Sequence, residues 1–142
     1  GERHAVNLEA LRWLDAIAKK ISAGFLITID YGSRYPAGAC NPPRTFFKHY
    51  QGTDDLTQPG RDITSNVDFE ALMGEGRKSS LDLESYSTLS RFLLDGGIED
   101  WIRPEAEGLD SFKARSKIKT LLHPEGMGEI FKVLIQSKGL AS

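Results

Sequence analysis

Three consecutive residues at the end of an apolar run, Asp30, Tyr31 and Gly32, could take part in chemistry. A carboxylate at the carboxyl end of a buried strand can accept hydrogen bonds from a cationic or amide-bearing ligand. A glycine there lets the chain turn away or lets a ligand approach the backbone closely. The alternative is structural, because Asp30 could simply cap the following loop, and the residues alone favour neither interpretation.

A second polar cluster lies in the segment PGRDITSNVDF, residues 59–69, which holds Asp62, Thr64 and Asp68. It gathers two acids, an Arg, a Thr and an Asn beside a turn. The residues alone favour a simple structural interpretation, in which the turn leads into a helix and Asp68 is its N-cap.

Other motifs argue against several kinds of site. The segment GEGRKS, residues 74–79, lacks the Gly-Lys-Ser/Thr succession of a phosphate loop, and it precedes a predicted strand instead of following one. The histidines are far apart and none has a partner at a zinc-like spacing, so we expect no metal site. They are His4, His49 and His123. Cys40 has no nearby His, which argues against a nucleophilic thiol.

Composition limits the class of protein. The 142 residues, 39% of them hydrophobic, allow one domain with a core but are too few to predict two. With 18 basic and 20 acidic side chains, the net charge of -2 would not recruit nucleic acid or an anionic membrane surface. A lone cysteine, the lack of a leader-like N-terminus and the lack of an apolar run of about 18 residues predict a soluble protein in a reducing, cytoplasmic setting.

The elements that must position these residues begin with a helix over residues 7–22, with Asn7 as its N-cap and Gly24 just past its end. The strand FLITID, residues 25–30, lacks apolar/polar alternation, which predicts a strand covered on both faces. Residues 33–66 are rich in Gly, Pro, Asn and Asp, which predicts an irregular surface excursion. Loops of this length often carry function.

Shorter elements are predicted in the rest of the chain. A helix over residues 69–78 would be ended by Gly74 and Gly76, and Ser87 would cap another helix over residues 88–97. The remaining predicted elements are a strand over 80–86, an apolar turn over 98–102, a basic amphipathic helix over 111–122 and a last strand over 129–137.

The number of strands does not suit a closed α/β domain. About three strands are too few for a strand buried on both faces, and the chain opens on a helix whose preceding parallel strand would lie upstream. The chain therefore has the pattern of the second half of a doubly wound domain. The alternative is an independent small fold in which a dimer partner covers the apolar strand.

Five segments together resemble a known family: GFLITIDYG, TFFKHY, PGRDITSNVDFEAL, FLLDGGI and IKTLLHPEGMGEIFKVLIQSKG. In this order they resemble the C-terminal half of the MidA-type S-adenosylmethionine-dependent methyltransferases. That family includes bacterial members and a mitochondrial complex I assembly factor. The resemblance covers residues 8–140. Its most specific parts are the IDYG strand end, the PG-x-DIT-x-x-VDF block and the terminal MGE-x-FKVL strand.

This resemblance implies a class I, Rossmann-like α/β methyltransferase fold with a mixed sheet whose last strand runs antiparallel. Residues 1–142 would be a single partial domain, the C-terminal half of that fold, with residues 33–66 as a lid-like excursion. The family's glycine-rich loop and acidic ribose contact lie in its N-terminal half. We therefore expect S-adenosylmethionine to bind the intact enzyme, and no cofactor-binding residue in this chain.

The activity implied by the resemblance is methyl transfer to a protein substrate, with arginine as the acceptor by family analogy. Because a guanidinium is a poor nucleophile, carboxylates must orient it and stabilise its charge. The resemblance points to catalytic roles for Asp30, Tyr31 and Asp62. Four further residues would contact the substrate: Gly32, His49, Thr64 and Asp68.

The chain departs from the family's pattern at several positions. TFFKHY replaces a Thr-Leu-x-x-Tyr pattern, Asn66 stands where a His is common, and TLSRFLL departs from a Thr-Gln-x-x-Phe-Leu form. These departures bear on substrate contacts more than on the fold. Whether the chain is an enzyme by itself stays open, because the competing hypothesis is a non-catalytic module that docks a partner, or a second copy of itself, through an exposed sheet edge.

Overall fold

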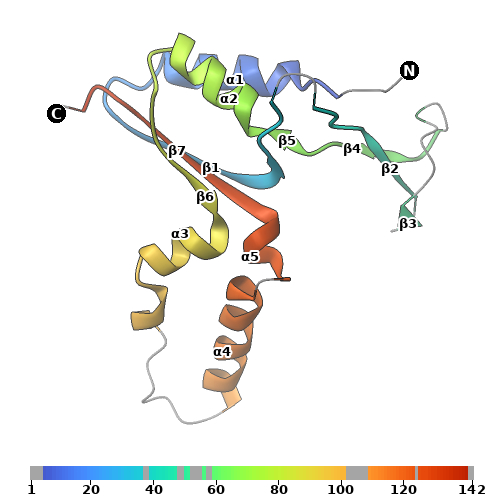
Figure 1. The fold of residues 1–142 in the computed structure, drawn as a ribbon, viewed down its shortest axis with the longest axis vertical. Coiled ribbons are helices and arrows are strands. Elements are labelled where there is room, and N and C mark those ends of the chain that lie inside the picture. Colours follow the sequence, from blue (N-terminus) through green and yellow to red (C-terminus); the bar gives the residue numbers. More distant parts are fainter. Residues whose placement is uncertain are drawn as a thin grey trace. The chain divides into compact units, whose positions relative to one another are not determined.

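The structure of the chain is a computed structural model that describes residues 5–36, 39–47, 50–51, 56, 59–101, 109–123 and 125–140. The chain divides into two compact units. The first unit comprises Gly1–Ile21 and Gly32–Leu81, and the second comprises Ser22–Tyr31 and Asp82–Ser142. Figure 1 shows the helices and strands of both units.

Two helices of the first unit, α1 (Leu8–Ala18) and α2 (Phe69–Lys78), pack against each other (Figure 1). Helix α1 begins where the sequence predicts, because the Oδ1 of Asn7 accepts a 3.0 Å hydrogen bond from the backbone N–H of Ala10. Each helix buries an apolar stripe. The buried hydrophobic residues of this unit are Leu14, Ala18, Phe69, Leu72, Met73 and Leu81.

The prediction that Gly74 and Gly76 end the second of these helices is wrong. Both glycines lie inside α2, which continues to Lys78. The buried side chains of Phe69 and Met73 anchor the helix, and this packing outweighs the weak helix propensity of glycine. The GEGRKS segment is therefore mostly helical, which agrees with the prediction that it is not a phosphate loop.

Residues 33–66 contain strands, so the prediction of a wholly irregular excursion is wrong. Strand β2 (Arg44–Phe47) pairs antiparallel with β3 (Tyr50–Gln51) and with β4 (Asp62–Thr64), in the order β3-β2-β4. Each strand has only two to four residues. Strands this short show no hydrophobic periodicity, which is why the sequence does not reveal them.

The first unit also contains a short parallel pair of strands. Strand β5 (Val67–Asp68) pairs in parallel with the last two residues of β1 (Gly24–Ser33), and Gly32 lies opposite Val67. Asp68 is both the end of this strand and the residue before α2. The first turn of α2 therefore follows directly from the parallel strand pair.

Three strands form the sheet of the second unit. Strand β7 (Phe131–Lys138) runs antiparallel to both β1 and β6 (Asp82–Thr88) and lies between them. In the middle of β7, Val133 and Leu134 are fully buried. Strand β1 thus has a parallel neighbour, β5, and an antiparallel neighbour, β7, so the sheet is mixed. The antiparallel direction of β7 confirms the prediction for the last strand.

The prediction that β1 is covered on both faces is wrong for the described chain. Its burial alternates, and the side chains of Phe25, Ile27, Ile29 and Tyr31 are exposed on one face. A strand becomes buried on both faces only when neighbours and helices cover it. The apolar run therefore carries more hydrophobic surface than the described residues cover.

The second unit also contains α3 (Leu89–Asp95), the 3₁₀ helix η1 (Ile98–Trp101), α4 (Leu109–Leu122) and α5 (Met127–Ile130). Thr88, not Ser87, caps α3, because its Oγ1 accepts a 3.3 Å hydrogen bond from the N–H of Arg91. The buried hydroxyl of Ser90 donates to the carboxylate of Glu129 and so links α3 to α5. None of the helices in the described ranges is long and apolar enough to cross a membrane.

Candidate functional site

Gly32 lies where two backbones come into close contact at the end of β1. A Cβ at this position would lie 2.2 Å from the carbonyl oxygen of Val67 and 2.9 Å from the ring of Phe69. Real side chains do not tolerate such distances, so the pairing of β1 with β5 requires glycine here. The sequence suggested close approach at Gly32, and the partner in the structure is the neighbouring strand.

Asp68 caps α2, as the simpler interpretation of the sequence predicts. Its Oδ1 accepts hydrogen bonds from the backbone N–H groups of Glu70, at 3.0 Å, and Ala71, at 3.2 Å. These are two of the donors that the first turn of a helix leaves without an intrahelical partner. The carboxylate of Asp68 therefore has a structural task.

Asn66 is the centre of a hydrogen-bond network in the first unit. Its Nδ2 donates a 2.8 Å bond to the hydroxyl of Tyr35, and its Oδ1 accepts from the guanidinium of Arg44. Its backbone carbonyl accepts a 2.9 Å bond from the Nδ2 of Asn41. Asn66 thus connects three residues that precede it in the chain by 22 to 31 positions.

Sequence reasoning missed the partners of Asn66, although it singled out Asn66 as a departure from the family's His. The missed residues are Tyr35, Asn41 and Arg44. No periodicity links them, because they lie on a loop and at the start of a short strand. The signal that could have indicated them is the presence of three hydrogen-bonding side chains close to Pro42 and Pro43.

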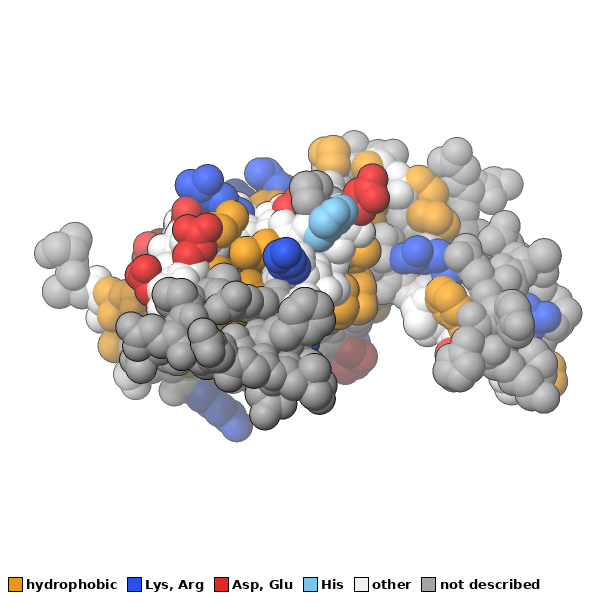
Figure 2. All heavy atoms as spheres, turned by 90° about the horizontal axis from the view of Figure 1, so that it is seen from below, with side chains coloured by type: hydrophobic (Ala, Val, Ile, Leu, Met, Phe, Trp, Pro, Cys, Tyr) orange, Lys and Arg blue, Asp and Glu red, His pale blue; other side chains and the backbone are white. Residues whose placement is uncertain are grey.

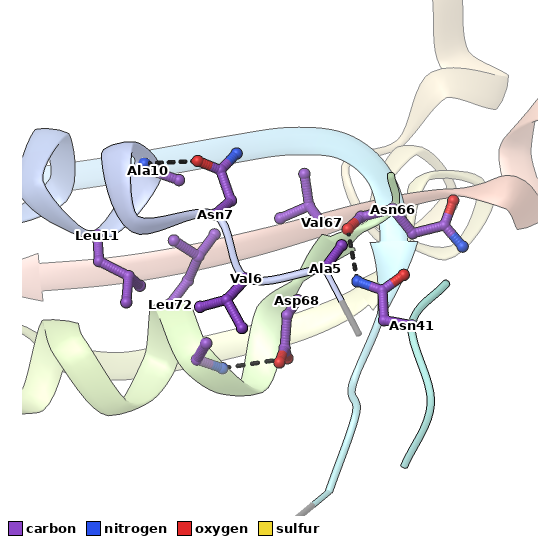
Figure 3. A pocket seen from close by; sticks show the side chains of 11 residues that line it. Ala5, Val6, Asn7, Ala10, Leu11, Asn41, Asn66, Val67, Asp68 and Leu72 are labelled. Atoms are coloured by element: carbon purple, nitrogen blue, oxygen red, sulfur yellow. Dashed lines mark hydrogen bonds between the residues drawn. The ribbon is translucent and has the colours of Figure 1, made fainter. Parts of the chain in front are cut away.

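A small cavity lies beside this network (Figure 3). Its volume is about 50 Å³. Asn7, Asn41, Asn66 and Asp68 supply its polar lining. The other lining residues are Ala5, Val6, Ala10, Leu11, Val67, Ala71 and Leu72. Pockets for small-molecule ligands usually have roughly 300 Å³ or more, so this cavity suits a few water molecules and not a nucleoside cofactor.

Asp30 and Tyr31 lie in the second unit, at the end of β1. The Oδ1 of Asp30 accepts a 2.7 Å hydrogen bond from the N–H of Tyr31. The ring of Tyr31 packs on that of Phe131, with centroids 4.0 Å apart and planes inclined by 36°. Asp30 is exposed and lies opposite Lys132 in the strand register. Here an acid and an aromatic side chain are both accessible to solvent.

The remaining predicted site residues lie in or near the three-stranded sheet of the first unit. Asp62 and Thr64 are exposed on β4, where Asp62 lies opposite Phe46 and Thr64 opposite Arg44. The prediction for His49 falls outside the described residues. The predicted set is thus divided between the units, with Asp30 and Tyr31 in the second and Gly32, Asp62, Thr64 and Asp68 in the first.

The described side chains offer no metal site. On the face that Figure 2 draws, they also form no large patch of one charge. Among the described residues, no group of three or more His, Cys, Asp or Glu side chains is placed to hold a metal ion. Figure 2 shows Lys and Arg side chains interspersed with acidic and hydrophobic ones.

These elements define the chain as an α/β protein with a mixed sheet, consistent with a fragment of a Rossmann-like fold. Residues 1–87 match the model of the family described as "Putative S-adenosyl-L-methionine-dependent methyltransferase". This match covers more than half of the chain, and the chain belongs to this family. No curated protein sequence matches the chain.

Two solved structures from Burkholderia thailandensis are similar to this chain over nearly its whole length. An uncharacterised protein has 27% sequence identity and a TM-score of 0.79, over 96% of this chain and 39% of its own. A second protein of the same superfamily, described as a "likely methyl transferase" bound to S-adenosyl-homocysteine, has 29% identity and a TM-score of 0.76, over 94% and 36%. This chain thus spans less than two fifths of the length of either protein.

Proposed function

We propose that this chain is the C-terminal part of an S-adenosylmethionine-dependent methyltransferase. The observation that carries the proposal is the similarity to a solved protein bound to S-adenosyl-homocysteine, the compound that remains when S-adenosylmethionine has given up its methyl group. The family match over residues 1–87 supports the same chemistry. The net charge of -2 favours a protein substrate over nucleic acid or an anionic membrane surface, and the lone Cys40 favours a cytoplasmic setting.

The described residues do not by themselves fit the cofactor. The cavity of about 50 Å³ is too small for it, and the glycines of α2 lie within a helix instead of opening one after a strand. The cofactor supplies an electrophilic methyl group when it is bound. We therefore assign cofactor binding to the intact enzyme, and we assign to this chain the side of the site that receives the methyl acceptor.

An arginine side chain in a protein is the acceptor that we propose. Asp30 presents an exposed carboxylate whose Oδ1 is oriented by the N–H of Tyr31. A carboxylate can hold a guanidinium through two parallel hydrogen bonds and stabilise its charge. Tyr31 would be the aromatic neighbour of the acceptor, because it follows Asp30 directly on β1. The roles predicted for His49, Asp62, Thr64 and Asp68, and the lid predicted for residues 33–66, stay predictions.

The decisive experiment compares Asp30→Asn with the unchanged protein in a methyltransferase that contains this chain together with its cofactor-binding half. We expect methyl transfer to arginine-containing protein to fall at least about tenfold, because the neutral amide cannot stabilise the guanidinium. Calorimetry should show unchanged affinity for S-adenosyl-homocysteine. Asp82→Asn, at the exposed start of β6, is the matched control and should leave turnover unchanged. If turnover is equally unchanged in Asp30→Asn, Asp30 has no catalytic role.

A non-catalytic interaction module is the second candidate. The exposed apolar side chains of β1 favour it, because they form a surface that a partner or a second copy of the chain could cover. Both candidates assume that this chain alone does not bind the cofactor. Calorimetry of the chain with S-adenosylmethionine tests this assumption. Tight binding by the short chain would show that the cofactor site does not need the other half.

A further inference from the structure

Asp30 and Lys132 carry opposite charges at directly opposite positions of two neighbouring strands. The antiparallel register of β1 with β7 pairs these two residues. Side chains at such positions leave the same face of the sheet, with Cβ atoms about 4.5–5.5 Å apart. Asp30 is exposed and Lys132 is half-buried. A cross-strand ion pair is the arrangement expected for two such charges.

The structure does not contain that ion pair. Of the ion pairs between described residues, none includes Asp30 or Lys132. The ammonium of Lys132 donates a hydrogen bond to the backbone carbonyl of Glu129. The Oδ1 of Asp30 accepts one from the backbone N–H of Tyr31. Each charge is thus held by a neutral backbone group, although the opposite charge is its direct neighbour in the sheet.

The carbonyl that holds Lys132 belongs to a helix with an anchor of its own. Glu129 lies in α5, and carbonyls in the last turn of a helix have no intrahelical donor, so a lysine can supply one. The carboxylate of Glu129 is bound elsewhere. It accepts hydrogen bonds from the buried hydroxyl of Ser90 and, at 3.4 Å, from the hydroxyl of Thr88. These bonds keep the carbonyl in place beside Lys132.

We infer that Lys132 is a positioning residue of the proposed acceptor site. Its ammonium alternates between the carbonyl of Glu129, where it leaves Asp30 open, and the carboxylate of Asp30, where it occupies the place of the acceptor's guanidinium. The inference rests on the proposed function, because it gives Asp30 a cationic acceptor. Lys132 then sets how much of the protein has a carboxylate ready for that acceptor.

Both positions of the ammonium are within reach and close in free energy. Lysine has a flexible four-carbon stem and a head group with three donors, so a change of rotamer is enough to exchange partners. An exposed ion pair gains little over a hydrogen bond to a carbonyl, because water screens the charges. A guanidinium can displace the ammonium, since it binds a carboxylate through two parallel hydrogen bonds.

The test uses the methyltransferase that contains this chain together with its cofactor-binding half. Calorimetry, with S-adenosyl-homocysteine present, measures the Kd of a short peptide that contains one arginine. Lys132→Met removes the competing ammonium, so we expect the Kd to fall about two- to fivefold. Lys132→Gln should give the same fall and replaces Lys132→Met if that variant does not fold. A peptide with citrulline in place of arginine is neutral, and its Kd should not respond.

Two control variants separate this effect from a general loss of positive charge. Lys132→Arg keeps a cation that can bind Asp30, so the Kd of the arginine peptide should stay the same or rise. Lys20→Met removes an exposed lysine just beyond α1 and should change the Kd by less than about twofold. In an Asp30→Asn background, Lys132→Met should no longer lower the Kd, because the carboxylate for which the two cations compete is gone.

Urea unfolding of the chain gives a readout that needs neither acceptor nor cofactor. The midpoint loss caused by Asp30→Asn and Lys132→Met together should be smaller than the sum of the two single losses, by about 0.1–0.5 M. Additive losses would overturn the inference, and so would a Kd that Lys132→Met leaves unchanged or raises. Non-additive losses in an enzyme that does not bind the arginine peptide would support the contact of Lys132 with Asp30 and contradict the proposed function.

Discussion

The side-chain amide of Asn66 donates a 2.8 Å hydrogen bond to the hydroxyl of Tyr35, which lies 31 residues earlier in the chain. The same side chain accepts a hydrogen bond from Arg44. Tyr35 and Arg44 flank the segment of residues 36–43, which is rich in proline. Asn66 therefore ties Tyr35 and Arg44 to the segment that leads into β5.

Replacing Asn66 tests this network. Asn66→Ala removes both side-chain hydrogen bonds and leaves Tyr35 and Arg44 without this partner, so we expect a loss of about 1–3 kcal/mol in the free energy of unfolding. Urea unfolding of the chain measures it. Ser65→Ala, at the exposed neighbouring position, should change stability by no more than about 0.5 kcal/mol. Equal stability of the two variants would show that the network contributes nothing.

The cap of α2 can be separated from the charge of Asp68. Asp68→Ala should lower the free energy of unfolding by about 1 kcal/mol, because the N–H groups of Glu70 and Ala71 lose their acceptor. Asp68→Asn keeps an oxygen at the same place and should retain most of the stability. Thermal unfolding distinguishes the two. A large loss in both variants would mean that the negative charge, and not the cap geometry, is what matters.

Two glycines should respond in opposite ways to alanine. Gly32→Ala would place a methyl group against the carbonyl of Val67, and we expect a loss of about 3 kcal/mol as the pairing of β1 with β5 is disrupted. Gly74→Ala meets nothing within 4 Å inside α2 and should stabilise the chain by about 1 kcal/mol. Urea midpoints give both signs, and a stabilising Gly32→Ala would contradict the close approach.

Acid stability should depend on Asp15. The ammonium of Lys19, at 2.6 Å, and the hydroxyl of Ser79, at 3.1 Å, both donate to its carboxylate. The hydrogen bond from Lys19 is the main cause that lowers the pKa of Asp15 below its ordinary value of 3.8, while partial burial opposes the shift. The folded state therefore favours the ionised carboxylate, and this stabilisation is present above the ordinary pKa and is lost as the pH falls through the lowered one.

Asp15→Asn tests the direction of this effect. The variant should be less stable than the unchanged chain near neutral pH, and the difference should shrink as the pH falls below about 4. Urea unfolding across that range provides the measurement. Parallel pH profiles for the two proteins would show that the pKa of Asp15 is the same in the folded and unfolded states.

The sequence predicts some elements well because their signals are local. Asn7 and Asp68 each cap a helix through a hydrogen bond to a residue two or three positions away, which a pattern of neighbouring residues can reveal. The three strands within residues 33–66 escaped prediction, because β2 and β4 pair across a long connection, with Arg44 opposite Thr64. Their stability comes from contacts between distant residues, which local patterns do not record.

By itself, the sequence determined the N-caps of α1 and α2, the long apolar strand and the resemblance to methyltransferases, because each depends on the order of neighbouring residues. Only the tertiary structure decided which residues meet Asn66, why position 32 must be glycine, and which face of β1 stays exposed. These properties arise when segments far apart in the chain pack together, and the free energy of that packing selects the partners.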